Sequence, residues 1–206
     1  MPPSDPFALF AWEVLSRKAS PAGRDAAMAA LRRVHVLTPD AVTRAPRATL
    51  EAAVAPAGPS VELRLDALRA GAEVFRRHRA LPGAIRRSLA TARRSLRVLT
   101  QLDVAGAHRM LLFAGDHAFV PVDAGVRRVA LRLGYGQPEK VLSVRGVRRV
   151  LGSLLRADLD ACRRAFVYLS HHASLTCTER EPHCRVCPLA PECPWVLGNP
   201  SAKPPV

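Results

Sequence analysis

The sequence is poor in aromatic residues and has no long apolar run. Phe, Trp and Tyr make up 5% of the 206 residues, although 49% are apolar. The core must therefore be built mainly from small aliphatic side chains, which favours helices over an all-β sandwich. The most apolar stretch, 110–122, is interrupted by Asp116 and His117. It falls short of the roughly 20 apolar residues that a membrane span requires.

Strand patterns and a secretion signal are also missing. No stretch alternates apolar and polar residues for long enough to predict a sheet. The amino terminus, Met-Pro-Pro-Ser-Asp-Pro, lacks the charged and then apolar layout of a signal peptide. We therefore expect a soluble, cytoplasmic, all-α protein with no membrane partner. Apolar residues recur at helical spacing in the segments 5–16, 26–34, 49–54, 63–78, 85–99, 109–114, 125–133, 147–156 and 159–171.

Acidic residues and lysines are scarce beside arginine. The chain has 17 Asp and Glu against 31 Lys and Arg, a formal net charge of +14. Only Lys18, Lys140 and Lys203 are lysines, so most of the cations are guanidinium groups, which fork onto phosphate oxygens. The large net positive charge predicts a polyanionic partner, although any single arginine can equally be a solvated surface residue.

Four of the five cysteines form one motif near the carboxyl end, Cys177-x6-Cys184-x2-Cys187-x5-Cys193. Four thiolates in one loop that contains several prolines can surround a [4Fe–4S] cluster, with one sulfur bound to each iron. A zinc site of four thiolates is the alternative, but such sites usually contain two Cys-x2-Cys pairs. Disulfides are a further alternative and are rare in the cytosol. We predict the cluster, and we expect the fifth cysteine, Cys162, to lie in the core.

This motif at the end of a basic helical chain resembles the endonuclease III group of helix-hairpin-helix DNA glycosylases. Residues 5–16, Asp-Pro-Phe through Leu-Ser, are similar to that family's opening helix, and 37–39 to its second connector. Val122-Asp123 and the basic helix that follows resemble the segment that carries the catalytic aspartate. His172 falls where the family often has a histidine. The resemblance covers nearly the whole chain.

The resemblance implies two helical lobes with DNA bound in the cleft between them. Residues 1–118 would form the six-helix helix-hairpin-helix lobe. Residues 119–206 would form the cluster lobe, with the cluster loop at 177–193. An extended Ala-Phe-Val-Pro-Val-Asp segment marks this boundary in the sequence. We therefore expect a monomer that binds double-stranded DNA at the nucleoid.

A glycosylase must extrude a nucleotide and break the C1′–N bond through a transition state with oxocarbenium character. A carboxylate beside the sugar is the minimal equipment for this step. Asp123 is the candidate, because it ends an extended stretch and precedes the small pair Ala124-Gly125, which lets a helix start close to a ligand. Asp123 can also simply cap that helix, and the two roles are compatible.

The family's hairpin carries Leu-Pro-Gly-Val-Gly and then a lysine whose amine attacks C1′. Residues 102–109 here read Leu-Asp-Val-Ala-Gly-Ala-His-Arg, without that lysine. Alignment on Gly106 places His108 at the lysine position, and alignment on Asp123 places Ala105 there. Neither side chain can form the imine that β-elimination needs. The resemblance therefore implies a monofunctional, water-using glycosylase of base-excision repair without AP-lyase activity, with His108 as a contact to water or to the released base.

Gly106 is the one remaining glycine of the hairpin turn that aims N–H groups at a phosphate in this family. DNA contacts are therefore also assigned to arginines, which include Arg109 and Arg128. Arg128 and Arg132 lie one helical turn apart and are expected to face DNA or water. Further DNA-binding candidates are Lys18, where relatives carry a gap-filling glutamine, and Arg180 of the cluster loop.

Two other functions fit the same residues. The degraded hairpin is compatible with a non-catalytic relative that recognises lesions or distorted duplex and has lost turnover, whereas the retained Asp123 favours the enzyme. The cluster motif alone would also suit a redox-sensing DNA binder.

Overall fold

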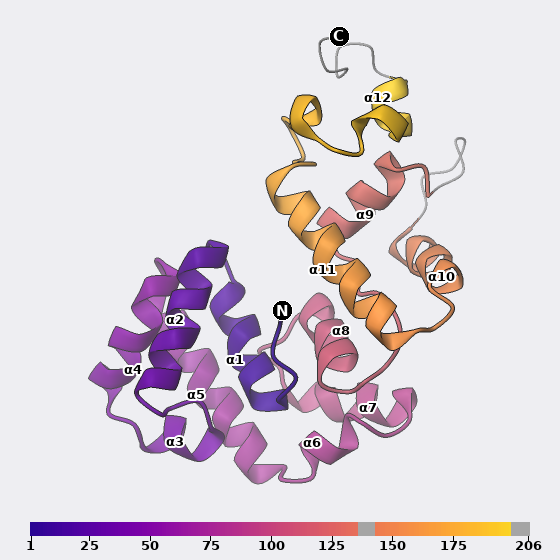
Figure 1. The fold of residues 1–206 in the computed structure, drawn as a ribbon. Coiled ribbons are helices and arrows are strands. Elements are labelled where there is room, and N and C mark those ends of the chain that lie inside the picture. Colours follow the sequence, from indigo (N-terminus) through magenta and orange to yellow (C-terminus); the bar gives the residue numbers. More distant parts are fainter. Residues whose placement is uncertain (136–142, 199–206) are drawn as a thin grey trace. The chain divides into compact units, whose positions relative to one another are not determined.

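The structure is a computed structural model that describes residues 1–135 and 143–198 (Figure 1). No residue in these two ranges belongs to a β-strand, which confirms the all-α class. The α-helices are α1 (Pro6–Ser16), α2 (Pro21–Arg33), α3 (Pro39–Arg44), α4 (Arg47–Val54), α5 (Val61–Arg77), α6 (Leu81–Ala84), α7 (Leu89–Ser95), α8 (Val104–Phe113), α9 (Ala124–Arg132), α10 (Val144–Leu154), α11 (Leu159–Leu175) and α12 (Pro194–Leu197). Short 3-10 turns are η1 (Ala55–Ala57), η2 (Leu96–Val98), η3 (Cys184–Val186) and η4 (Ala190–Glu192).

Side-chain caps followed by proline begin the first three helices. Asp5 accepts a hydrogen bond from the Ala8 N–H at 2.8 Å, and Ser20 and Thr38 cap α2 and α3 in the same way. Proline suits the first helical position because its missing N–H would have no helical partner there. Pro39 therefore starts α3.

Contacts between Cα atoms divide the chain into two compact units, Met1–His117 and Ala118–Val206. In the first unit the scarce aromatic residues are concentrated where α1 meets α5. The ring of Phe7 lies 6.1 Å from that of Phe10 and 5.3 Å from that of Phe75. A Cβ on Gly71 would fall 2.1 Å from the Phe10 ring, so this close contact requires glycine.

Arg64 of α5 is a buried arginine. Its side chain is buried and donates to the carbonyl oxygens of Gly58 at 2.8 Å and Arg17 at 2.7 Å, and also to that of Pro59. A buried guanidinium is tolerated because these carbonyls replace its hydration. Arg64 thus fixes the turn before α5 against the end of α1.

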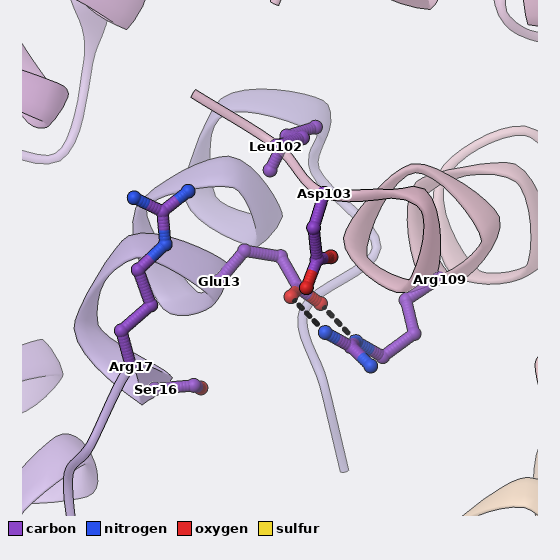
Figure 2. A pocket seen from close by; sticks show the side chains of 6 residues that line it. All are labelled: Glu13, Ser16, Arg17, Leu102, Asp103 and Arg109. Atoms are coloured by element: carbon purple, nitrogen blue, oxygen red, sulfur yellow. Dashed lines mark hydrogen bonds and ion pairs between the residues drawn. The ribbon is translucent and has the colours of Figure 1, made fainter. Parts of the chain in front are cut away.

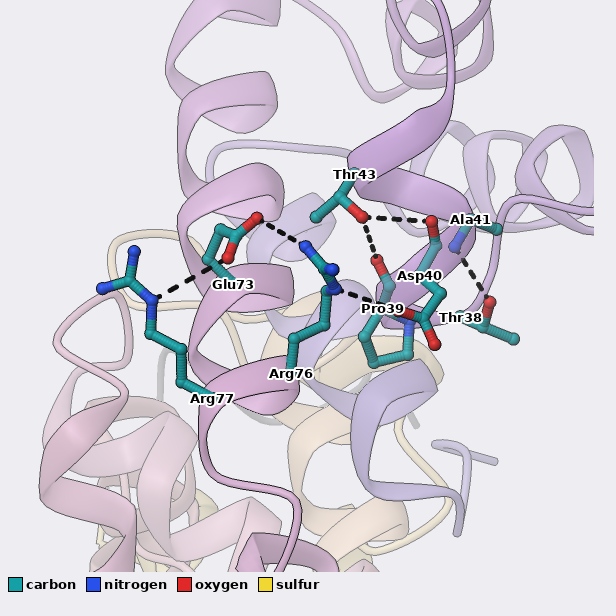
Figure 3. A network of polar contacts seen from close by, with 8 residues as sticks. All are labelled: Thr38, Pro39, Asp40, Ala41, Thr43, Glu73, Arg76 and Arg77. Atoms are coloured by element: carbon teal, nitrogen blue, oxygen red, sulfur yellow. Dashed lines mark hydrogen bonds and ion pairs between the residues drawn. The ribbon is translucent and has the colours of Figure 1, made fainter.

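A polar network joins α3 to α5 on the surface of the first unit (Figure 3). Arg76 Nε lies 2.9 Å from Asp40 Oδ1, and its Nη1 lies 3.0 Å from Glu73 Oε1. These side chains are about half exposed, so solvent screens the ion pairs and they add little to stability. The network engages the Arg76 guanidinium in contacts within the protein, so this side chain would have to break them before it could bind a ligand.

In the second unit α9 packs against α11, and α10 buries Val147 and Leu151. Cys162 on α11 is fully buried, as is nearly all of Phe166, which confirms Cys162 as a core residue. Among the residues described, no helix combines the length and apolar character needed to cross a membrane.

Candidate functional sites

Asp123 is the N-cap of α9, as the capping interpretation predicted. Its backbone is extended, with φ −92° and ψ −174°, and its Oδ1 accepts a hydrogen bond from the Val126 N–H at 2.8 Å. The preceding segment is anchored by Val120 and Val122, both buried. The carboxylate is therefore held in a fixed orientation at the start of a helix. Its catalytic role stays a prediction.

Gly125 allows α9 to pack closely against α11. A Cβ added to Gly125 would lie 3.0 Å from the Cβ of Ala173 on α11. The protein itself, through Ala173, thus occupies the space next to Gly125. The small residues after Asp123 correctly indicated that another group comes close to the start of α9. They did not indicate that this group is Ala173 of α11.

The predicted hairpin lies between α7 and α8, and Asp103 caps α8. Asp103 Oδ1 accepts a hydrogen bond from the Gly106 N–H at 2.6 Å. A Cβ on Gly106 would lie 3.1 Å from that oxygen and 3.2 Å from Glu13 Oε2. Gly106 is therefore in the first turn of α8 with two carboxylates against it. The Gly106 N–H is thus donated to Asp103, and a role of Gly106 in DNA binding stays a prediction from the sequence.

A polar pocket in the first unit is lined by Glu13, Ser16, Arg17, Leu102, Asp103 and Arg109 (Figure 2). Arg109 Nε lies 2.6 Å from Glu13 Oε1, and its Nη2 lies 2.6 Å from Oε2. The Glu13 side chain is 4% exposed and that of Arg109 is 16% exposed. Arg109 is thus engaged in a buried bidentate pair, and its assignment as a DNA contact stays a prediction.

Sequence reasoning overlooked Glu13. The residue lies among Phe10, Val14 and Leu15 on a helix whose length is almost entirely buried. A carboxylate in that position needs a cationic partner, because burial of an unpaired charge is costly. The pattern could have indicated a buried ion pair, although it could not name Arg109.

The four cysteines of the motif line one pocket together with His172, Arg132 and Trp195. All five cysteines of the chain are free thiols. Burial raises the pKa of the Cys184 thiol, the other three cysteines of the motif raise it further, and Arg132 opposes them. Within the described ranges, no group of three or more His, Cys, Asp or Glu side chains is arranged so that it could hold a metal ion. The pocket's donor set of four thiols nevertheless has the chemistry that a [4Fe–4S] cluster requires.

Arg132 supports the cysteine loop directly. Its Nη1 donates to Cys177 Sγ at 3.3 Å and to the Thr178 carbonyl at 2.7 Å, and its Nη2 donates to the Glu179 carbonyl at 3.1 Å. The guanidinium carbon also lies 4.7 Å from the centre of the Trp195 ring, within cation–π range. One side chain therefore joins α9 to three consecutive residues of the loop and to α12.

Arg128 supports the end of α11 that leads into the loop. Its Nε donates to the Cys177 carbonyl at 3.0 Å, and its Nη2 donates to the Ala173 carbonyl at 2.9 Å. Arg128 and Arg132 therefore do not simply face water, because each donates hydrogen bonds to backbone carbonyls of the second unit. A DNA contact by Arg128 stays a prediction from the sequence. His172, placed by resemblance, lies with its Nε2 3.9 Å from Cys187 Sγ, and burial lowers the pKa of its imidazole.

The remaining candidates are distributed over both units. Lys18 is exposed just after α1 and has a φ of +49°, a left-handed conformation uncommon outside glycine. His108 is half-buried on α8, and Arg180 is exposed in the cysteine loop. The roles given to these three residues stay predictions.

Neither a family model nor a curated protein matches the chain. Solved structures do match it. A trapped endonuclease III–DNA covalent intermediate, an estranged-adenine complex, is 20% identical with a TM-score of 0.67, and the match covers 94% of this chain and 85% of that chain. A thermostable thymine-DNA glycosylase is 18% identical with a TM-score of 0.70, covering 95% and 86%. A non-covalent endonuclease III–DNA complex is 20% identical with a TM-score of 0.69, covering 96% and 86%. The chain therefore has the fold of endonuclease III and of this thymine-DNA glycosylase.

Proposed function

We propose that the protein is a DNA glycosylase of base-excision repair that hydrolyses the C1′–N bond with water. The observation that carries the proposal is the match over nearly the whole chain to glycosylase structures, two of them in complex with DNA. A net charge of +14 supports duplex DNA as the partner.

Asp123 is the proposed catalytic carboxylate. The hydrogen bond from the Val126 N–H fixes its orientation, and a preorganised charge is what stabilises a developing oxocarbenium ion most effectively. The same carboxylate can direct a water molecule at C1′. Its capping bond is compatible with both tasks because a carboxylate has two oxygens that accept hydrogen bonds.

The proposed reaction stops at an abasic site. Residues 102–113, which include all of α8, contain no lysine, so this helix offers no primary amine for an imine with C1′. His108 on α8 can orient water or contact the released base, but its imidazole cannot take the lysine's place. We therefore assign hydrolase activity without an AP-lyase step.

We further propose that Cys177, Cys184, Cys187 and Cys193 hold a [4Fe–4S] cluster. The support is that these four thiols, separated by up to 16 positions in the sequence, line one pocket with apolar residues such as Leu133 and Val196. When bound, such a cluster would cross-link the loop and could exchange single electrons. Four thiolates around a cluster carry net negative charge, and Arg132 is placed to compensate part of it.

The non-catalytic DNA binder is the second candidate. This candidate is supported by the hairpin, in which the Gly106 N–H donates a hydrogen bond to Asp103 and Arg109 is paired with Glu13. A hairpin without these phosphate contacts would position a scissile nucleotide less firmly.

Duplex oligonucleotides that carry a panel of damaged or mismatched bases distinguish the candidates. Each duplex is incubated with the protein in three samples: one is left untreated, one receives alkali afterwards, and one contains borohydride during the incubation. The proposal predicts strand breaks only after alkali and no covalent complex after borohydride. Efficient borohydride trapping would contradict the water-using route. Tight binding without excision on every duplex would favour the non-catalytic candidate.

A further inference from the structure

An acid-free basic segment separates Glu73 from Asp103. Residues 74–102 contain no Asp or Glu and carry the arginines Arg76, Arg77, Arg79, Arg86, Arg87, Arg93, Arg94 and Arg97. Such a run of one sign concentrates positive potential on α6, α7 and the turns around them. Sequence reasoning placed its DNA-binding arginines elsewhere and passed over this segment.

Several arginines of this segment are already engaged within the protein. Arg76 pairs with Asp40 and Glu73, and Arg77 Nε lies 3.9 Å from Glu73 Oε2. Arg86 donates to the Ala114 carbonyl at 3.1 Å and lies 3.9 Å from Asp116. These side chains would have to break existing contacts before they could bind a ligand.

Four arginines on and beside α7 remain available, and we call them the α7 arginine face: Arg87, Arg93, Arg94 and Arg97. All four are exposed, and in the described part of the chain no carboxylate lies within ion-pair distance of them. The opposite side of the segment is fixed, because Ala92 and Leu96 are buried. The guanidinium groups are thus mounted on an anchored element and directed to solvent.

The neighbouring hairpin turn is poorly suited to an anion. Asp103 occupies the Gly106 N–H at 2.6 Å, and Glu13 Oε2 would lie 3.2 Å from a Cβ on the same glycine. Two carboxylates at the start of α8 neutralise the partial positive charge of that helix end, which would otherwise attract an anion. Arg109, a cation of the same pocket, is already bound to Glu13 by two hydrogen bonds.

We propose that the α7 arginine face binds the phosphate backbone of duplex DNA, in place of the hairpin turn. The inference rests on the proposed function, since it takes DNA as the partner. Guanidinium groups bind phosphate through forked, charge-assisted hydrogen bonds that do not depend on base sequence. The face would therefore position the duplex without selecting the base to be excised.

A charge-matched pair of variants tests the proposal. R93Q/R94Q/R97Q removes three cations from the face, and R32Q/R33Q/R44Q removes three exposed cations from α2 and α3. Affinity for a short fluorescein-labelled duplex is measured by anisotropy over a range of salt concentrations. We expect the first variant to bind at least about tenfold more weakly, with a salt slope reduced in magnitude by about 2 to 3. The control should lose about twofold or less.

Equal losses in the two variants would overturn the proposal, because net charge alone would then explain binding. If the first variant unfolds, modification of the wild-type protein by phenylglyoxal gives an independent answer. Duplex should slow the modification of Arg93, Arg94 and Arg97 and leave Arg32 and Arg33 unaffected, and the opposite pattern would overturn the face. If the wild type excises bases and R93Q/R94Q/R97Q binds the duplex with the affinity of the wild type, this inference alone would be rejected. Failure of the wild type to bind duplex would reject the proposed function as well.

Discussion

Arg109 of α8 and Glu13 of α1 form a bidentate ion pair in the first unit, with both N–O distances at 2.6 Å. The pair joins the opening helix to the second helix of the hairpin across 96 positions of sequence. Glu13 is almost completely buried, so the carboxylate depends on Arg109 to offset its lost hydration. The pair gives an arginine beside the predicted DNA-binding turn a structural partner within the protein.

Replacing Arg109 by Ala should therefore destabilise the protein strongly. The change leaves a buried carboxylate without its cation, and we expect the free energy of unfolding to fall by about 3 to 5 kcal/mol. Urea denaturation measures the loss. Arg32→Ala, at an exposed position on α2, should change it by about 0.5 kcal/mol or less. An Arg109→Ala protein as stable as this control would show that Glu13 has another partner.

The purified protein should carry iron and sulfide at about four each per chain and should be yellow-brown. Cys184→Ser should bleach it, because one iron of the cluster would lose its thiolate. Metal analysis and visible absorbance after anaerobic purification measure both effects. A colourless protein with stoichiometric zinc would reject the cluster and leave the zinc alternative.

Arg132 should control how firmly the loop retains that cluster. Arg132→Gln removes the hydrogen bonds to Cys177 Sγ and to two loop carbonyls, so a chelator should bleach the variant several-fold faster than the wild type. Arg180→Gln removes an exposed arginine of the same loop and serves as the control. Identical bleaching rates in the two variants would show that the contacts of Arg132 are dispensable.

Cys162 should make stability fall at alkaline pH. Burial raises the pKa of its thiol above the ordinary value, and Asp158 adds to the effect. Below the pKa of the thiol in the unfolded protein, the thiol is protonated in both the folded and the unfolded state, so the free energy of unfolding does not change with pH. As the pH rises through that value the unfolded state loses its proton first, which favours unfolding. Urea midpoints between about pH 8 and about pH 10 should therefore fall more for the wild type than for Cys162→Val. Parallel curves would contradict the prediction.

The local signals of the sequence predicted much of the fold. Asp5 before Pro6 begins α1 where the sequence placed it, and Asp123 caps α9 as its position indicated. The starts of α2 at Pro21 and of α3 at Pro39 were not predicted. The cysteine spacing predicted a loop whose thiols gather around one pocket. In each case the interacting atoms are close in sequence, or the spacing itself carries the chemistry.

The partners of the arginines could not be predicted in the same way. Helical periodicity correctly placed Arg128 and Arg132 on one face, but it does not say which segment packs against that face. Their acceptors on α11 and in the cysteine loop lie 45 or more positions away. The pairing of Arg109 could not be predicted for the same reason, because its partner Glu13 is on another helix. Tertiary contacts therefore decide which arginines are structural and which remain free for DNA.

Single-turnover base release by Asp123→Asn measures the central claim most directly. Asp66→Asn removes a carboxylate from an exposed position on α5 and is the matched control. On a duplex that the wild type cleaves after alkali, Asp123→Asn should release base at least about 10²-fold more slowly, with nearly unchanged affinity for the duplex. Asp66→Asn should match the wild type in both. An Asp123→Asn protein that releases base at the wild-type rate would contradict the account.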